Sequence, residues 1–296
     1  MLATRLKGVI VPVIAPFTDG GKLDTDSFRR MTHRLLDRRV NGLVINGTTG
    51  ESPTVRWEEV SRMTEIALEA RGRERDVPIL VGTGSNDTAQ AVRLTRRSRS
   101  LGADGALVVT PYYNRPSVQG VLEHYRRVAE VGLPIVAYHI PYRTGVELNP
   151  DELAALLDID GVVGIKESTG GIRNFIELGG RTDKALLCGD DLYFFAALCC
   201  GASGGMLASA NVAAGRFVGV YDSLAGGRFE EAKASFAELV PLIRLLFAEP
   251  NPAPLKWLLA QTGQISSEEM RLPMTPISEG LRRRMEPLLE SYRDYL

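Results

Sequence analysis

The chain has 296 residues, of which 44% are hydrophobic and 24% are charged, so it is long enough to bury a large core. Its 35 Lys and Arg residues nearly balance its 36 Asp and Glu residues, which leaves a net charge of −1. Proteins that bind nucleic acid or membrane surfaces generally need a basic excess, so we expect neither partner and expect a small-molecule substrate instead.

Short apolar runs alternate with amphipathic stretches, beginning with a strand near the start of the chain. Residues 1–17 carry basic residues before an apolar stretch, but Pro12 and Pro16 interrupt it and no small-residue cleavage site follows, so we expect no secretion signal. We predict eight strands, each rich in Val, Ile, Leu or Ala as a strand covered on both faces must be. They are residues 9–16, 42–46, 79–82, 106–110, 135–139, 162–166, 185–188 and 204–208.

Helical spacing of apolar residues fills the gaps between these strands, often after an Asp, Ser or Asn that can cap a helix. The predicted helices are residues 26–39, 56–71, 88–101, 118–131, 150–157, 172–179 and 193–200. This alternation predicts an α/β fold, a (β/α)8 TIM barrel. A doubly wound sheet is the alternative, but Ala15-Pro16-Phe17-Thr18 follows the first strand where that fold usually has a glycine-rich phosphate turn.

After about residue 222 the pattern is helical only, with candidates at residues 228–247, 254–262 and 278–295. We therefore expect a catalytic barrel over residues 1–222 and a helical region over residues 223–296 that packs on it. Residues 192–215 carry no charge, but glycines, serines and Asn211 interrupt them, so we interpret them as a helix followed by a buried strand. Cys188, Cys199 and Cys200 form no CxxC pair, which predicts neither a disulfide framework nor a zinc site and fits a cytoplasmic protein.

Lys166 in Gly164-Ile165-Lys166-Glu167-Ser168 ends the sixth predicted strand. In a (β/α)8 barrel the active site lies at the carboxyl ends of the strands, so this side chain is expected to enter a pocket. Burial favours the neutral form of a lysine amine, and the neutral amine can attack a carbonyl to form a Schiff base. Without its neighbours, however, one lysine among 35 basic residues is most often a solvated surface charge.

Other polar residues follow the ends of neighbouring strands. The turn Asn46-Gly47-Thr48-Thr49-Gly50-Glu51 offers hydroxyls and backbone N–H groups to a carboxylate, although an ordinary turn would also use its glycines. Tyr112 and Tyr113 follow the fourth strand, where they could pack at an interface or extend a proton relay. After the fifth strand, Arg143 could bind a substrate carboxylate through its guanidinium.

Tyr138 ends the strand next to that of Lys166, so its phenol can serve as an acid or base there. Strand alternation places His139 on the opposite face, which favours a hydrogen-bonded core histidine. His33 and His124 fall on helical stretches and are expected at the surface, so no metal site is predicted.

The carboxylates offer no clear acid–base pair. Asp190 and Asp191 are interpreted as helix caps, and Glu51 and Glu167 stay ambiguous between structural and functional roles.

The joint order of these motifs, with Val81-Gly82-Thr83-Gly84, Asn251-Pro252, Lys256-Trp257 and Arg271-Leu272-Pro273, resembles the dihydrodipicolinate synthase family. That family belongs to the pyruvate-dependent class I aldolases, which also include N-acetylneuraminate lyase. The resemblance covers nearly the whole chain.

The resemblance implies a role for each matching residue. Lys166 would form the Schiff base with pyruvate, Thr48 and Thr49 would hold the pyruvate carboxylate and pass protons, and Tyr138 would donate and accept the central proton. Tyr113 would reach across a tight dimer to complete a relay, which implies a homo-oligomer, either a dimer or a tetramer built as a dimer of dimers. Arg143 would bind the carboxylate of the second substrate. Gly189 and Met206 would line the pyruvate, and Met206 stands where the family pattern implies a β-branched residue.

The implied reaction condenses pyruvate with an aldehyde, expected to be aspartate semialdehyde, on the route to lysine and diaminopimelate. The covalent Schiff base on Lys166 requires no organic cofactor and no metal. The alternatives are a related pyruvate aldolase or a 2-keto-3-deoxy sugar-acid aldolase or dehydratase with another aldehyde, or a non-catalytic pyruvate sensor. Arg143-Thr144 favours the first reading, and retention of the relay residues disfavours a sensor.

Several residues depart from the family pattern. His139 replaces an Asn, and Tyr142 stands where a small residue is common, so we expect these two positions to bear on the choice of aldehyde. In the cleft where bacterial relatives bind the feedback inhibitor lysine, Asn86 and Tyr112 match. The altered positions of that cleft are Pro53, Trp57, Val60 and Gln90. We therefore expect lysine inhibition to be weak or absent.

Overall fold

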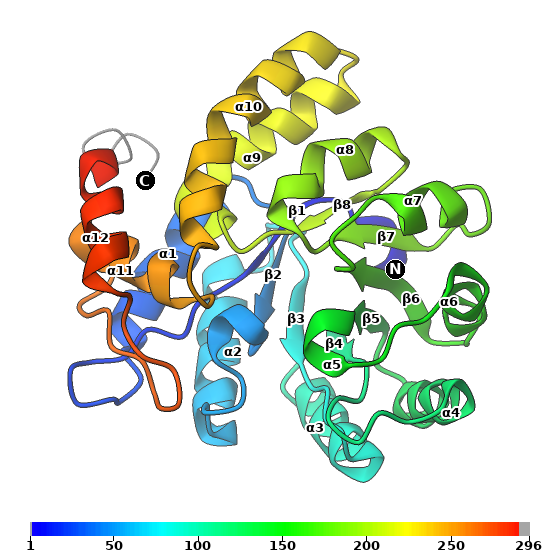
Figure 1. The fold of residues 1–296 in the computed structure, drawn as a ribbon. Coiled ribbons are helices and arrows are strands. Elements are labelled where there is room, and N and C mark those ends of the chain that lie inside the picture. Colours follow the sequence, from blue (N-terminus) through cyan, green and yellow to red (C-terminus); the bar gives the residue numbers. More distant parts are fainter. Residues whose placement is uncertain (1, 290–296) are drawn as a thin grey trace.

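The computed structural model describes residues 2–289, in which eight parallel strands close into a barrel surrounded by helices (Figure 1). The predicted (β/α)8 fold is thereby confirmed. Each strand pairs with the next along the chain, and β8 pairs with β1 to close the barrel. The strands are β1 (Gly8–Pro12), β2 (Gly42–Ile45), β3 (Ile79–Gly82), β4 (Gly105–Val109), β5 (Ile135–His139), β6 (Val162–Glu167), β7 (Ala185–Cys188) and β8 (Gly204–Met206).

Helices connect the strands on the outside of the barrel. They are α1 (Thr25–Asp37), α2 (Trp57–Arg71), α3 (Thr88–Ser100), α4 (Val118–Ala129), α5 (Pro141–Thr144), α6 (Pro150–Leu157), α7 (Arg173–Leu178), α8 (Phe194–Cys199) and α9 (Ala210–Ala225). Several begin at caps that the sequence indicates. The Asp24 carboxylate accepts the Ser27 N–H before α1, and Asn149 forms a capping box with Glu152 before α6.

The main differences from the predicted elements concern β1, β8 and the helix that follows β8. β1 ends at Pro12 and β8 at Met206, both short of their predicted ends, because after these residues the chain leaves the barrel wall. Helix α9 was not predicted, because its alanines and glycines blur the helical spacing of apolar residues. The division into a barrel and a C-terminal region at residue 222 remains a proposal, and α9 spans that position.

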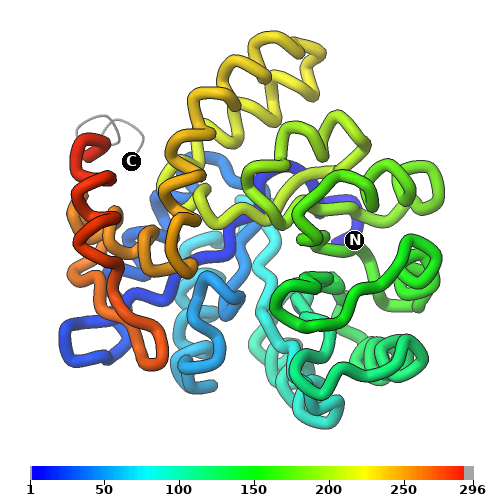
Figure 2. Tube along the Cα trace, viewed as in Figure 1, coloured from blue at the N-terminus to red at the C-terminus, as the bar shows by residue number. Residues whose placement is uncertain are grey.

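Helices α10 (Phe229–Leu246), α11 (Ala253–Gln261) and α12 (Glu279–Met285), with the 3₁₀ helix η4 (Glu286–Leu288), form the C-terminal helical region. Figures 1 and 2 show α10 alongside α9, and both α11 and α12 contact α10. Ser266 anchors that arrangement by donating its backbone N–H to Ser27 Oγ on α1 at 3.2 Å. The final predicted helix, residues 278–295, is present as far as the described residues extend, and residues 290–295 lie outside them.

Alternate residues of the strands belong to two separate buried clusters. One contains Val9, Val11 and Ile165 together with the helices, so these side chains face outward to the helical layer. The other contains Ile10, Tyr138 and further strand residues. Among the described residues it includes no side chain from the helices outside the barrel, so it fills the barrel interior. The strand residues of this inner cluster are Ile10, Val44, Leu80, Leu107, Val136, Tyr138, Ala185, Leu187 and Met206.

The uncharged stretch over residues 192–215 contains α8, β8 and the first turns of α9, as the reading of a helix followed by a buried strand requires. Within residues 2–289, no helix has both the length and the apolar character needed to cross a membrane.

His124 corrects one prediction, because it is buried rather than at the surface. It lies on α4 with 3% of its surface exposed, and its Nδ1 is 3.0 Å from Thr88 Oγ1 on α3. Its Nε2 has no hydrogen-bond partner within the described part of the chain. Burial lowers the pKa of His124 to about 4, since the imidazolium would lose its hydration. His33, by contrast, is exposed on α1 as expected.

This burial predicts a pH-dependent loss of stability. Between pH 6.5 and about 4 the unfolded chain binds a proton at His124 that the folded chain does not, so the free energy of unfolding should fall as pH drops through this window. The loss should reach up to about 3 kcal/mol, and His124→Gln should remove it. Urea unfolding at pH 7 and pH 4 measures the difference. His33 is exposed and serves as the control. If His33→Gln reduced the pH-dependent loss of stability as much as His124→Gln does, burial would not be its origin.

Candidate active site

Lys166 lies near the end of β6, inside the mouth of the barrel. It pairs in register with Tyr138 of β5 and Leu187 of β7, and both partners belong to the inner cluster, so the lysine side chain shares their inward face. Its Nζ stands 4.2 Å from the centre of the Tyr138 ring, and the residue is 6% exposed. The structure therefore brings the predicted nucleophile and the predicted acid–base residue together.

Gly189, directly after β7, packs against the Lys166 side chain. A Cβ at Gly189 would lie 2.7 Å from Lys166 Cε and 3.0 Å from its Cγ, closer than carbon atoms can approach. The same position would overlap the Ser168 hydroxyl, which is buried and has no hydrogen-bond partner among residues 2–289. Glycine is thus required here to leave room for the lysine, and Ser168 is a polar neighbour that sequence reasoning did not single out.

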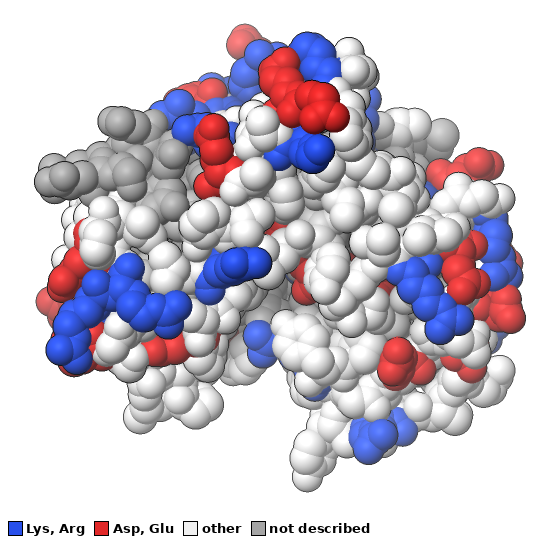
Figure 3. Space-filling view, turned by 45° about the horizontal axis from the view of Figure 1, so that its top comes forward, with Lys and Arg blue, Asp and Glu red and all other residues white. Residues whose placement is uncertain are grey.

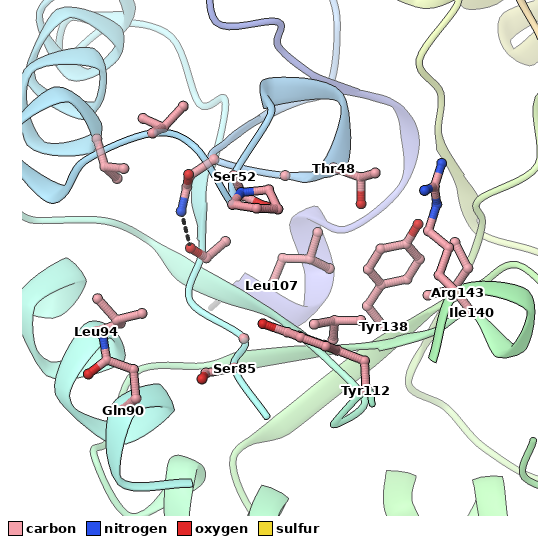
Figure 4. A pocket seen from close by; sticks show the side chains of 18 of the residues that line it. Thr48, Ser52, Ser85, Gln90, Leu94, Leu107, Tyr112, Tyr138, Ile140 and Arg143 are labelled. Carbon is pink, nitrogen blue, oxygen red and sulfur yellow. Dashed lines mark hydrogen bonds between the residues drawn. The ribbon is translucent and has the colours of Figure 1, made fainter. Parts of the chain in front are cut away.

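A cavity of about 460 Å³ opens beside this pair (Figure 4). Thr48, Tyr138 and Arg143 of the predicted set line it, and Figure 4 shows them along one side, with Gln90 and Leu94 at the opposite end. The cavity lining does not include the other predicted site residues, which are Lys166, Thr49, Gly189, Met206 and Tyr113. The full lining is Asn46, Gly47, Thr48, Ser52, Pro53, Val55, Trp57, Val60, Gly82, Gly84, Ser85, Gln90, Leu94, Leu107, Val109, Tyr112, Tyr138, Ile140, Arg143 and Thr144.

The turn after β2 contains the 3₁₀ helix η2 (Thr48–Gly50). Asn46 enters it in a left-handed conformation (φ 61°) and donates its side-chain N–H to the Gly82 carbonyl of β3 at 2.8 Å. Thr48 reaches the cavity, whereas Thr49 is 3% exposed and its Oγ1 accepts a hydrogen bond from Asn251 Nδ2 at 3.0 Å. These hydrogen bonds join the turn to β3 and to the segment between α10 and α11.

Glu51 ends this turn in a left-handed conformation (φ 54°), and its carboxylate contacts the C-terminal helical region. Its Oε1 lies 2.6 Å from Lys256 Nζ, and both side chains are almost fully buried. Its Oε2 accepts the backbone N–H of Arg271 at 3.2 Å. Together with the Thr49–Asn251 hydrogen bond, these two contacts join the turn to the C-terminal region. Sequence spacing could not reveal a partner 205 residues away.

Tyr113 and Arg143 take exposed positions. Tyr113 is 88% exposed with φ 69°, and it does not line the cavity of its own chain. Arg143, on α5, lies over the Tyr142 ring at 5.2 Å and donates from Nε to its hydroxyl at 3.3 Å. Thus Tyr113 is exposed and does not line the cavity, whereas Arg143 lines it with Tyr142 beside it.

His139 faces the helical layer rather than the cavity. Its Nδ1 lies 2.7 Å from Glu167 Oε2, and its Nε2 accepts the Leu148 backbone N–H at 3.0 Å. Because Nε2 is an acceptor, the imidazole is neutral and its proton sits on Nδ1, facing the Glu167 carboxylate. His139 is a hydrogen-bonded core residue, as strand alternation predicts.

Asp190 and Asp191 are not helix caps as interpreted, because neither side chain bonds the 3₁₀ helix η3 (Asp191–Tyr193) that follows. Asp190 Oδ2 accepts the Gly170 N–H at 2.8 Å, and Asp191 accepts the backbone N–H groups of Ala208 and Ser209 after β8. Burial raises the pKa of Asp191 to about 6, against the lowering effect of those N–H groups and of nearby Lys166. These carboxylates connect the loops that surround Lys166.

The part of the chain that the structure describes contains no group of three or more His, Cys, Asp or Glu side chains that could hold a metal ion. All three cysteines are free thiols.

Comparisons with known proteins agree with this arrangement. The model of the dihydrodipicolinate synthetase family matches residues 5–292. The 4-hydroxy-tetrahydrodipicolinate synthase of Syntrophobacter fumaroxidans is 38% identical over 97% of this chain and 98% of that protein. A dihydrodipicolinate synthase structure from Thermotoga maritima superposes with a TM-score of 0.93 at 35% identity, covering 99% of this chain and all of that one. A chloride-inhibited dihydrodipicolinate synthase from Acinetobacter baumannii, complexed with pyruvate, has a TM-score of 0.92 at 33% identity and covers 97% of this chain and 99% of that one.

The buried Lys256–Glu51 pair predicts a large stability effect. Lys256→Met leaves the Glu51 carboxylate buried without its counter-charge, which should lower the free energy of unfolding by about 3–5 kcal/mol. The control is Arg173→Met, which breaks an exposed ion pair with Glu177 and should cost less than about 1 kcal/mol. Urea unfolding compares the two variants, and similar losses in both would contradict the importance of the buried pair.

Proposed function

The chain belongs to the dihydrodipicolinate synthetase family, and on that premise we propose that it condenses pyruvate with L-aspartate semialdehyde to 4-hydroxy-tetrahydrodipicolinate through a Schiff base on Lys166. The observation that carries the proposal is the Lys166–Tyr138 pair, with an amine 4.2 Å from a phenol ring at the barrel mouth. A substrate carbonyl at this place would meet a nucleophile and a proton donor together.

In the proposed reaction, the neutral Lys166 amine attacks the keto carbon of pyruvate, and one water leaves as the protonated imine forms. The imine withdraws electrons, so a methyl proton departs to give an enamine. The enamine carbon then bonds to the aldehyde carbon, whose oxygen takes up a proton and stays as the hydroxyl group. Finally the amine of the second substrate displaces the lysine and closes the ring, which returns Lys166 to the free amine.

The other site residues take supporting roles in this proposal. Tyr138 and Thr48 line the cavity and would pass protons between the reacting atoms, and Thr49 would bind the pyruvate carboxylate. Arg143, the one charged side chain among the described residues that line the cavity, would bind the carboxylate of the aldehyde. Gly189 leaves space for the lysine, and Met206, in the inner cluster, would contact pyruvate.

We also propose that the enzyme works as a homo-oligomer, a dimer or a tetramer of two dimers. An exposed tyrosine on a loop with positive φ at Tyr113 and Arg115 is suited to enter the site of a second copy. The proposed location is the cytoplasm, in keeping with the three free thiols. The face in Figure 3 carries interspersed basic and acidic side chains, which supports a small-molecule enzyme over one that binds nucleic acid or membrane. The proposed chemistry uses neither a metal nor an organic cofactor.

Borohydride reduction in the presence of pyruvate tests the nucleophile. We expect peptide mass mapping to find one stable adduct, on Lys166, because reduction traps the imine. Buried Lys256 is the internal control within the same digest. An adduct on Lys256, or none at all, would overturn the assignment. Turnover with aspartate semialdehyde against sugar-derived aldehydes then separates this synthase from a 2-keto-3-deoxy sugar-acid aldolase or dehydratase.

Free lysine should inhibit this enzyme weakly or not at all. The cavity includes Pro53, Trp57 and Gln90, and its lining has no Asp or Glu to pair with a lysine ammonium group. Steady-state rates with added lysine measure the effect. Inhibition at micromolar lysine would show that this expectation is wrong.

A further inference from the structure

Two side chains of the C-terminal helical region hold the turn at residues 47–51 from outside the barrel. Asn251 donates from Nδ2 to Thr49 Oγ1, and Lys256 Nζ forms the buried ion pair with Glu51. Both contacts bridge more than 200 residues of sequence. The middle and the end of the turn that is proposed to bind pyruvate are therefore held by the C-terminal helical region.

The contact between Asn251 and Thr49 has a defined polarity. A threonine hydroxyl has one proton to donate and lone pairs that accept. Because Thr49 Oγ1 accepts the Asn251 amide proton, its own proton is left to be donated elsewhere. A hydroxyl oriented in this way is suited to donate to a carboxylate, which can only accept. The direction of this one hydrogen bond therefore favours an acceptor, such as a carboxylate, as the second partner of the Thr49 hydroxyl.

The contact between Lys256 and Glu51 holds the backbone at the end of the turn. Glu51 is a non-glycine residue in the left-handed region, which costs about 1 kcal/mol and persists only where surrounding contacts hold it. Lys256 Nζ also donates to the Glu269 carbonyl at 2.7 Å and lies 4.1 Å from the centre of the Phe17 ring. With its ammonium contacted on several sides and 0% exposed, Lys256 is a rigid support for Glu51.

We propose that Asn251 and Lys256 are positioning residues for the pyruvate reaction: Lys256 holds the backbone of the turn through Glu51, and Asn251 directs the Thr49 hydroxyl proton toward the pyruvate carboxylate. This inference rests on the proposed function. The C-terminal helical region is then part of the substrate-binding apparatus, although none of its residues up to 289 lines the cavity.

The pyruvate dependence of borohydride trapping at Lys166 tests the polarity. Asn251→Ala removes the donor and should raise the half-saturating pyruvate concentration by about threefold to tenfold. Asn251→Asp has the same shape but offers an acceptor, so it should draw the Thr49 proton away and raise that concentration further, by at least about tenfold more. If Asn251 served folding alone, Asn251→Asp would raise the half-saturating pyruvate concentration less than Asn251→Ala, because Asp has the same shape as Asn and disturbs packing less.

Two comparisons make the result decisive. In a Thr49→Val background the hydroxyl is absent, so the extra effect of Asn251→Asp should largely disappear. Asn149→Asp adds the same charge at an exposed helix cap, where either residue serves, and should leave the pyruvate dependence unchanged. The inference is overturned if Asn251→Asp is no worse than Asn251→Ala, or if its extra effect persists without the Thr49 hydroxyl. Failure of the unmodified protein to form any adduct would instead remove the proposed function, and this inference with it.

Discussion

The register between β5 and β6 is the constraint on which the proposed chemistry depends. It sets Tyr138 opposite Lys166 on the inner face of the barrel and, one residue later, His139 opposite Glu167 on the outer face. A slip of one residue would exchange the two faces and put the lysine among the helices. The neutral His139 and its carboxylate partner occupy the outer layer, where the Leu148 backbone N–H completes the histidine's hydrogen bonds. The reactive pair and this structural pair are therefore two consequences of one alignment.

Around this alignment, loops from distant parts of the chain are joined by buried polar contacts rather than by apolar packing alone. Asp191 ties the loop after β7 to the one after β8, and Glu51 ties the turn after β2 to the C-terminal region. Buried carboxylates cost hydration, so each is surrounded by N–H donors or a counter-charge. These contacts hold the loops in place, because the short strands that the loops follow do not fix their positions alone.

The barrel could be predicted because its strands and helices carry local patterns. The lysine, the tyrosine beside it and the Gly-Thr-Thr-Gly turn could be found because they follow strand ends, a property that one sequence displays. The helix from Ala210 was missed because its many small residues blur the helical spacing. The burial of His124 and the pairing of Glu51 with Lys256 could not be predicted, since both depend on which surfaces meet in three dimensions. The misreading of Asp190 and Asp191 has the same cause: a local cap was the simplest partner, and the fold supplied distant ones.

A crystal structure of the protein soaked with pyruvate tests the central claim, that Lys166 is the covalent nucleophile of this barrel. The account predicts continuous electron density from Lys166 Nζ to the keto carbon, with the pyruvate carboxylate against the turn at Thr48 and Thr49. Pyruvate bound without a bond to Lys166, or bonded to another lysine, would contradict it.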